Sequence, residues 1–426
     1  MKKYFPFLFL FLPGVLIAQV RNLNYYIEQA VINSPLINKN KNESILAELD
    51  LKQVKAILSK PEINLEGNVM FAPIISRDNN SSHFEWVSNG AATYTGYDLA
   101  STDGGQYQAF VSVKKPVFNA SVFQTYSERV SISRQQNENQ IALTTHEIEQ
   151  LVSYQYILCL RIYLQAKNSS ELVKEVDSQL QILRKLVENG LYKQTDLMLL
   201  QIELQNYRIE TSGFLADYKS SIFDLNLICG INDTSYFEIP DINLHLKDEL
   251  PAVSQFLTSY KLDSLNIISE QGINEIKYKP QVNLFANAGL NAVYIPSLNR
   301  LGFSTGINFS WTVFDGNQKE IQKEKAKVNI LTLEFDKENF QTQNEINKNK
   351  ILNKLSSLEL SLTLIEAQLN QYYKLIEAFT MELSQGEISV MDLKSLIKDI
   401  ASKKQALSQL KMEEQSLINS YNYWNY

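Results

Sequence analysis

The sequence LNKLSSLELSLTLIEAQLNQYYKLIEAFTMEL at residues 352–383 gives the clearest indication of the fold class. Its apolar residues recur at alternating spacings of three and four over four heptads, at Leu355, Leu358, Leu362, Ile365, Leu369, Tyr372, Ile376, Phe379 and Leu383. This is the pattern of a coiled-coil seam, in which one apolar stripe packs against a partner helix. A less strict version lies at Leu172, Val176, Leu180, Leu183 and Val187. The sequence therefore predicts long helices that pack as coiled coils.

The positions of proline and glycine extend these patterns into very long helices. No proline lies between 117 and 239 or after 296, and glycine is scarce in the same tracts. Since both residues interrupt helices, such tracts are typical of long ones. Gly190 and Gly386 are expected to end a helix and to begin a tight turn into an antiparallel partner. The predicted helices cover about 22–59, 119–188, 195–229, 253–278, 317–385 and 390–424.

Four segments between the helices alternate apolar and polar residues, as β-strands do. They cover about 62–72, 105–117, 280–294 and 301–314. One face of each strand is apolar, and the other is mainly Asn, Ser, Gln and Gly. Each segment is long enough to cross a membrane as a β-strand, which takes about nine to eleven residues. A sheet with one face in water shows the same alternation and remains an alternative.

The chain contains an internal duplication. The segment PEINL at 61–65 recurs as PQVNL at 280–284, and VFN at 117–119 recurs as VFD at 313–315. Each repeat reads helix, strand, strand, long helix, short helix. The first repeat covers 20–230, the linker covers 231–251 and the second repeat covers 252–426. The two repeats differ mainly in a longer loop at 72–105, for which the sequence suggests no role.

The N-terminus has the features of an exported protein. Lys2 and Lys3 precede a short apolar run, so residues 1–19 are predicted to be a secretory signal peptide. No later stretch reaches the roughly 18 apolar residues of a transmembrane helix, so any membrane span is expected to be β. Four strands are too few for a closed barrel, because the smallest single-chain barrels have about eight. Three copies would supply twelve strands above a tube of helices.

Composition excludes several classes of function. The formal net charge of −7 lacks the basic footprint of a nucleic-acid-binding protein. The three histidines are scattered, and no clustered nucleophile, base or metal-ligand set is present, so neither an enzyme nor a metal or cofactor site is expected. Cys159 and Cys229 lie on opposite arms of the first predicted hairpin at similar heights. They are either a disulfide or two separate buried thiols.

The order of elements, the duplication and one turn motif together resemble the TolC family of outer-membrane channel proteins. GLYKQT at 190–195 matches the family's tip signature Val-Gly-Leu-x-x-x-Thr, with Asn189 in place of Val. KPVFN at 115–119 and WTVFDG at 311–316 are similar to the family's strand-to-helix junction. The resemblance covers about 20–426. It implies a homotrimer with a 12-stranded barrel in lipid of the cell outer membrane and a periplasmic α-helical coiled-coil tunnel.

The resemblance also implies a function. Such a channel is a passive exit duct that docks to a periplasmic adaptor protein and an inner-membrane transporter, for efflux of small toxic compounds or for type I protein secretion. The alternative from another class is a surface structural or adhesive coiled-coil protein without transport activity. That class would not need strand pairs with one polar face.

Site residues follow from the resemblance position by position. The residues expected to contact the adaptor lie at the hairpin tips: Asn189, Gly190, Leu191, Thr195, Gln385, Gly386 and Glu387. Asp392 matches a carboxylate of the pore aperture, while Ser395 departs from a second one. Asp196 matches the acidic partner of a latch between hairpins, although Leu383 and Ile388 stand at the partner positions. Each aspartate also begins a helix, where the helix dipole alone explains an acid.

Overall fold

The computed structural model describes residues 21–86, 91–97, 105–247, 254–293 and 298–426, so the predicted signal peptide at 1–19 lies outside the described residues. The chain forms two compact units. The helical unit comprises the residues up to Asn38, Ala142–Gln255 and Phe340–Tyr426. The sheet unit comprises Lys39–Ile141 and Phe256–Asn339.

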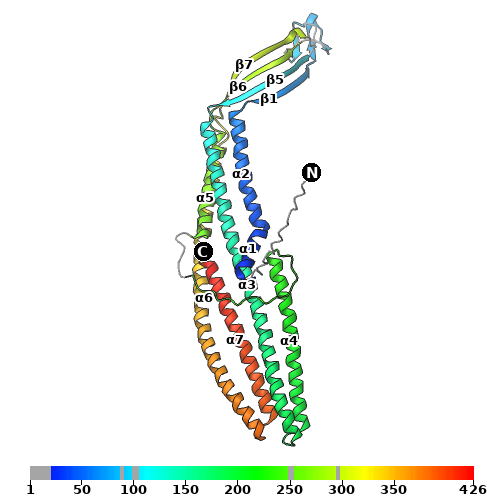
Figure 1. Ribbon diagram of the computed structural model, residues 1–426. Helices are drawn as coiled ribbons and strands as arrows, with labels where there is room; N and C mark the ends of the chain where they lie inside the picture. Colours follow the sequence, from blue (N-terminus) through cyan, green and yellow to red (C-terminus); the bar gives the residue numbers. More distant parts are fainter. Residues whose placement is uncertain (1–20, 87–90, 98–104, 248–253, 294–297) are drawn as a thin grey trace, which may run out of the picture. The chain divides into compact units, whose positions relative to one another are not determined.

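Two antiparallel helix pairs dominate the chain (Figure 1). The first hairpin consists of α3 (Ala120–Glu188) and α4 (Gln194–Ile228), and the second of α6 (Gln318–Gln385) and α7 (Val390–Trp424). All nine residues of the predicted seam in α6 are buried or half-buried. The predicted fold of long helical hairpins joined to a strand sheet is therefore confirmed. No described helix has an apolar window long enough to cross a membrane.

The single helix predicted over 22–59 is wrong, because two helices occupy this range. They are α1 (Leu23–Asn33) and α2 (Pro35–Ser59). Pro35 lacks a backbone N–H and disfavours helical geometry in the residue before it. Ser34 is accordingly extended, with ψ 117°, and its Oγ accepts a hydrogen bond from the backbone N–H of Ile37 at 3.3 Å. Ser34 thus caps the helix that Pro35 begins.

The sheet unit contains a four-stranded antiparallel sheet in the order β1-β5-β6-β7. Its strands are β1 (Glu62–Phe71), β5 (Gly105–Val117), β6 (Gln281–Ala292) and β7 (Leu301–Ser310). β7 ends at Ser310, four residues before the end of the predicted 301–314. The indole N–H of the next residue, Trp311, donates to the backbone carbonyl of Tyr278 at 3.3 Å. The helix α5 (Gln255–Ile276) precedes β6, and short 3₁₀ turns lie at Asp78–Asn80 and Leu298–Arg300.

The segment 72–105 is more than the predicted loop. It contains a second sheet in the order β3-β2-β4, made of β2 (Ile74–Ser76), β3 (His83–Glu85) and β4 (Tyr94–Gly96). The carboxylate of Asp78 accepts hydrogen bonds from the backbone N–H groups of Ala92 and Thr93 at 3.1 and 2.8 Å. Strands of three residues are too short to produce a detectable alternation, which is why the sequence did not reveal them.

Equivalent residues of the two repeats fix the junctions where the sheet meets the long helices. Asp315 accepts hydrogen bonds from the backbone N–H groups of Gln318 and Lys319, at 3.1 and 3.0 Å, and caps α6. The Tyr278 hydroxyl also donates to Asp315, at 2.5 Å. In the first repeat, the Asn119 amide donates to the carbonyl of Leu58 at 2.5 Å. Both junctions therefore connect the helix before the sheet to the helix after it.

The two cysteines lie in one buried core of the helical unit. Both are free thiols, so of the two alternatives the buried thiols hold. The Cys159 thiol donates to the carbonyl of Ser221 at 3.1 Å. Burial raises the pKa of Cys159 to about 11 and that of Cys229 to about 12. Both thiols are therefore protonated at neutral pH and poorly reactive.

The described part of the predicted linker, 231–247, has neither helix nor strand but is firmly attached to this core. The Tyr156 hydroxyl donates to the carbonyl of Pro240 at 2.6 Å. The Tyr218 hydroxyl donates to the carbonyl of Phe237 and accepts from the N–H of Ile239, both at 3.1 Å. The linker therefore packs against α3 and α4 through these hydrogen bonds.

Candidate functional site

The turns of the two hairpins lie at the same end of the helical unit (Figure 1) and share one backbone motif. Gly190 and Gly386 have φ angles of +74° and +79°, the left-handed region that glycine adopts without steric cost. The residue after each glycine donates a backbone hydrogen bond to the last turn of the helix. The Leu191 N–H donates to the carbonyl of Leu186 at 2.9 Å, and the Glu387 N–H donates to the carbonyl of Glu382 at 3.0 Å. Both turns are Schellman caps, as the sequence predicted.

The two aspartates occupy the same position in the helices that follow the turns. The carboxylate of Asp196 accepts a hydrogen bond from the backbone N–H of Lys193 at 3.0 Å and so caps α4. In α7 the cap is instead Ser389, whose hydroxyl accepts from the N–H of Met391 at 3.1 Å. The carboxylate of Asp392 is exposed in the first turn of α7, where its negative charge interacts favourably with the helix dipole.

The tip residues singled out in the sequence gather at the exposed end of the hairpins. A Cβ added at Gly190 or Gly386 would meet no atom within 4 Å, so the surface around both turns is open. The exposed residues are Asn189, Gly190, Leu191, Thr195, Gln385, Gly386 and Glu387. All seven residues are therefore on the surface at this end of the hairpins.

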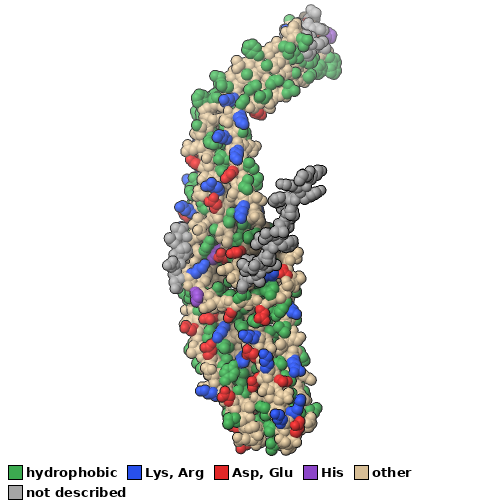
Figure 2. Space-filling model, in the orientation of Figure 1, with side chains coloured by type: hydrophobic (Ala, Val, Ile, Leu, Met, Phe, Trp, Pro, Cys, Tyr) green, Lys and Arg blue, Asp and Glu red, His purple; other side chains and the backbone are tan. Residues whose placement is uncertain are grey.

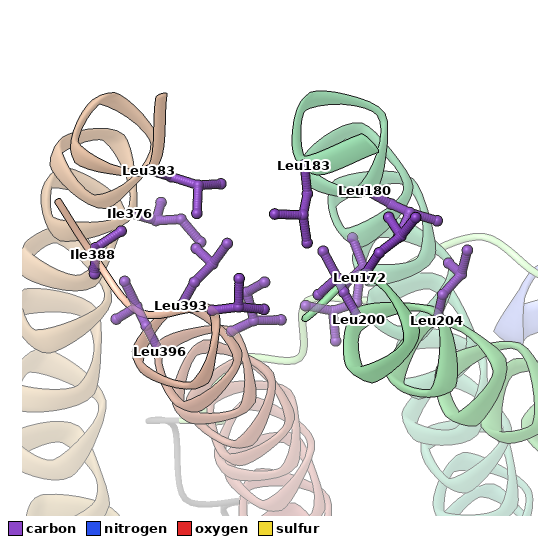
Figure 3. Packing of buried hydrophobic residues seen from close by; sticks show 14 of the residues in the cluster. Leu172, Leu180, Leu183, Leu200, Leu204, Ile376, Leu383, Ile388, Leu393 and Leu396 are labelled. Carbon is purple, nitrogen blue, oxygen red and sulfur yellow. The ribbon is translucent and has the colours of Figure 1, made fainter. Parts of the chain in front are cut away.

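Buried apolar side chains from both hairpins pack together behind the tips (Figure 3). We call this set the tip cluster: Leu172, Leu180, Leu183, Leu200, Leu204, Ile376, Leu383, Ile388, Leu393 and Leu396. Leu183 and Leu383 point toward each other from the two hairpins, and both are completely buried. Leu383 and Ile388, the residues at the latch partner positions, therefore belong to an apolar contact.

Four polar contacts between the hairpins surround the tip cluster, and the sequence revealed none of them. The Tyr192 hydroxyl donates to the carbonyl of Ile388 at 2.7 Å. The Gln179 amide donates to the Thr380 hydroxyl at 3.0 Å. The remaining two are ion pairs, Lys394–Glu203 at 3.1 Å and Lys404–Glu171 at 3.2 Å. Their partners lie about two hundred positions apart, so no local spacing could have indicated them.

The two ion pairs differ sharply in burial. Glu203 keeps 10% of its side-chain surface exposed, whereas Glu171 keeps 46%. Burial and the neighbouring Glu203 carboxylate also raise the pKa of Tyr207. Glu203 is therefore a nearly buried carboxylate with Lys394 as its counter-ion, and it also interacts with the Tyr207 hydroxyl. In the part of the chain that the structure describes, no group of three or more His, Cys, Asp or Glu residues is arranged to hold a metal ion.

Comparison by sequence finds no relatives, whereas comparison by structure does. No family model matches the chain, and no curated protein matches it by sequence. The outer-membrane protein VceC from Vibrio cholerae superimposes with a TM-score of 0.69 at 16% identity, over 95% of each chain. CusC gives a TM-score of 0.69 at 12% identity, over 96% of this chain and 92% of its own.

The outer-membrane channel MtrE from Neisseria gonorrhoeae gives a TM-score of 0.68 at 9% identity, over 95% of this chain and 88% of its own. At these identities the likeness concerns the fold, and it extends over nearly the whole chain. The resemblance deduced from the repeat and the tip motif is thereby confirmed: this chain has the fold of the TolC-family outer-membrane channels.

Proposed function

We propose that this chain is the outer-membrane channel component of a tripartite export system and works as a homotrimer. The observation that carries the proposal is an apolar sheet face that is exposed. The strand register places Leu65, Val111, Ala288 and Phe303 in one row across all four strands. Leu65 and Phe303 keep 84% and 86% of their surface exposed. Hydrophobic side chains with few charges also mark the sheet in Figure 2. An apolar surface of this kind calls for lipid or a protein partner.

The opposite face of the same sheet is polar. The adjacent row consists of Asn64, Ser112, Asn287 and Ser304. Glu66 accepts a hydrogen bond from the Ser112 hydroxyl at 2.6 Å and lies 3.4 Å from Lys114. Apolar-outside and polar-inside alternation is typical of a membrane barrel that encloses water.

The edges of the sheet support a trimer. Among the described strands, β1 pairs only with β5, and β7 pairs only with β6. An open edge leaves backbone groups without hydrogen bonds, which costs several kcal/mol each in lipid. Because β1 and β7 run in opposite directions, β7 of one copy can pair antiparallel with β1 of the next. Three copies would close a barrel of twelve strands.

The strand lengths fit the thickness of a membrane. β1 and β7 each have ten residues. At about 3.3 Å per residue they span about 33 Å, and a tilt of about 40° reduces this to about 25 Å. That is the height of the apolar band of outer-membrane barrels.

The helical hairpins are proposed to form the periplasmic duct. Their exposed tips would dock on a periplasmic adaptor that links the channel to an inner-membrane transporter. The channel is passive and carries either small toxic compounds or a secreted protein, according to the transporter with which it assembles.

The oligomeric state tests this proposal directly. Because the exposed apolar face and the open edges both need cover, protein extracted in detergent is expected to have about three times the chain mass of 48.8 kDa. Sedimentation or light scattering that accounts for bound detergent measures it. A stable monomer that remains in solution without detergent would contradict the proposal.

Docking through the tips predicts that a bulky residue at Gly190 blocks export without preventing assembly. A Cβ there meets no atom within 4 Å, and the positive φ costs only about 1–2 kcal/mol. Gly190→Trp is therefore expected to leave trimers in the outer membrane but to abolish export in cells. Gly190→Asn is the matched control, because asparagine tolerates this backbone conformation, and it should export normally. Normal export by Gly190→Trp would show that the tip does not dock.

A ring of three Asp392 carboxylates predicts a channel that prefers cations. In a trimer, one exposed Asp392 carboxylate per chain would lie at the pore aperture, the narrow end of the proposed helical duct. Three like charges there would focus a negative potential. Asp392→Asn is expected to reduce cation selectivity, measured as the reversal potential in planar bilayers under a salt gradient. Asp217→Asn, an exposed acid elsewhere on α4, should leave selectivity unchanged. Equal selectivity in both variants would mean that Asp392 serves only the first turn of α7.

A further inference from the structure

The small sheet of the first repeat carries its large apolar side chains on an exposed face. The register pairs Ile75 with Phe84 on β3 and with Thr95 on β4, so these residues share one side. Trp86 and Tyr97 follow two residues after Phe84 and Thr95. The four large members of this face, Ile75, Phe84, Trp86 and Tyr97, are all exposed. We call them, together with Phe71, the aromatic face.

The other side of this sheet holds its buried residues. Ile74 and Ser76 keep only 1% and 4% of their surface exposed. Asp78 is held by the backbone N–H groups of the segment before β4, and the hydroxyl of Ser81 lies 2.7 Å from the His83 ring. Ile74 and Ser76 are therefore covered, whereas the large apolar side chains on the opposite side of this sheet remain exposed.

Ring contacts join the aromatic face to the large sheet. The Trp86 ring stacks on Phe71, with centroids 5.8 Å apart and planes 20° apart, and Phe84 meets Trp86 edge-on at 5.1 Å. Phe71 ends β1 and alternates in phase with Leu65 and Val69, so it lies on the proposed lipid-facing side. The aromatic face thus continues that side beyond the end of the strand.

The chemistry of the aromatic face fits one occupant. Trp and Tyr combine an apolar ring with a polar N–H or O–H, and they concentrate where the hydrocarbon of a bilayer meets its headgroups. A band that ends in Phe71 and is extended by Trp86, Phe84 and Tyr97 has this composition at the position where the hydrocarbon ends.

We propose that the β2–β3–β4 sheet is a wing that contacts the membrane, with its aromatic face in the headgroup region of the lipids around the barrel. This inference rests on the proposed function, since it takes the neighbouring sheet face to be covered by lipid. The shorter connection between β6 and β7 contains no such sheet within its described residues, so each chain would carry one wing and a trimer three.

The three tryptophans of the chain, Trp86, Trp311 and Trp424, allow the wing and the barrel to be tested separately. The full chain carrying Trp311→Phe and Trp424→Phe reports on Trp86 alone. The chain carrying Trp86→Phe and Trp424→Phe reports on Trp311, which follows β7 at the other end of the band. Both are reconstituted as trimers in phosphatidylcholine–phosphatidylglycerol vesicles that contain lipids with a nitroxide at the headgroup or deep in the acyl chain.

The headgroup nitroxide is expected to quench Trp86 emission at least about twofold more than the deep nitroxide does, because tryptophan prefers the interface. Trp311 should also be quenched by lipid nitroxides. If Trp311 is quenched but Trp86 responds only to aqueous acrylamide, the wing lies in water and the inference is wrong while the proposed function stands. Quenching of Trp86 by neither agent would mean that protein covers the face, and it overturns the inference as well. Absence of lipid quenching for both tryptophans would overturn the proposed function together with the wing.

Discussion

Replacing Leu65 or Phe303 by arginine is expected to prevent assembly of the protein in the outer membrane. Both side chains lie on the edge strands, in the exposed apolar row that crosses β5 at its central residue, Val111. An arginine on the lipid side of a barrel costs about 2–4 kcal/mol at the bilayer midplane. A trimer carries three copies, so the cost is about 6–12 kcal/mol per assembly, comparable to the total stability of a typical domain.

The neighbouring residues supply matched controls for these substitutions. Asn64→Arg and Ser304→Arg place the same charge one position earlier or later in the same strands, on the polar face. These variants should still assemble, because that face is proposed to meet water. The measurement is the amount of trimer in isolated outer membranes relative to total protein. Equal loss in all four variants would indicate a sheet with no lipid-facing side.

The main elements of this fold could be predicted because their signals are local. The heptads of α6 and the scarcity of proline and glycine encode long helices, and the period of two encodes the four long strands. Gly190 and Gly386 encode the hairpin turns through their backbone conformation alone. The repeat then related the two halves of the chain without any knowledge of their packing.

The sequence-based prediction missed the helix break at Pro35 and the three short strands, because the local signal for each is weak. Pro35 is visible in the sequence, and Ser34 before it is a favourable cap, yet 22–59 was predicted as a single helix. The strands β2, β3 and β4 are too short to show a period. Both features depend on segments of two or three residues, whereas periodicity needs a window of about eleven or more.

The contacts between the hairpins could not be predicted, because they join residues that are remote in sequence. The sequence showed that Leu383 and Ile388 do not match a polar latch, but not that an apolar cluster takes its place. Asp196, in contrast, makes a local contact with the backbone N–H of Lys193, as its place in the first turn of a helix had indicated. The pair Lys394–Glu203 depends on how α7 lies against α4, which only tertiary packing determines.

The ion pair Lys394–Glu203 is expected to influence opening of the proposed channel. We expect Lys394→Met to favour separation of the hairpins, because it leaves the nearly buried Glu203 without its counter-ion. Breaking one side of a buried ion pair costs about 3–5 kcal/mol, equivalent to roughly a hundredfold to several thousandfold in an equilibrium constant. If opening requires the hairpins to part, the open probability in planar bilayers should rise strongly.

Two further variants distinguish the effect of burying the Lys394–Glu203 pair from the effect of removing a lysine charge at any position. Lys404→Met removes the same charge from the same helix, but its partner Glu171 is well solvated, so the expected cost is below about 1 kcal/mol and gating should barely change. Lys394→Met combined with Glu203→Leu removes both charges and should restore the closed state, since replacement of a buried pair by apolar side chains is often neutral or stabilising.

Equal opening by Lys394→Met and Lys404→Met would show that net charge at the tip controls the channel. Failure of the double variant to close would show that Lys394 acts through another partner than Glu203. Closure by the double variant, together with unchanged gating in Lys404→Met, would show that Lys394 acts by compensating the buried charge of Glu203 between the two hairpins.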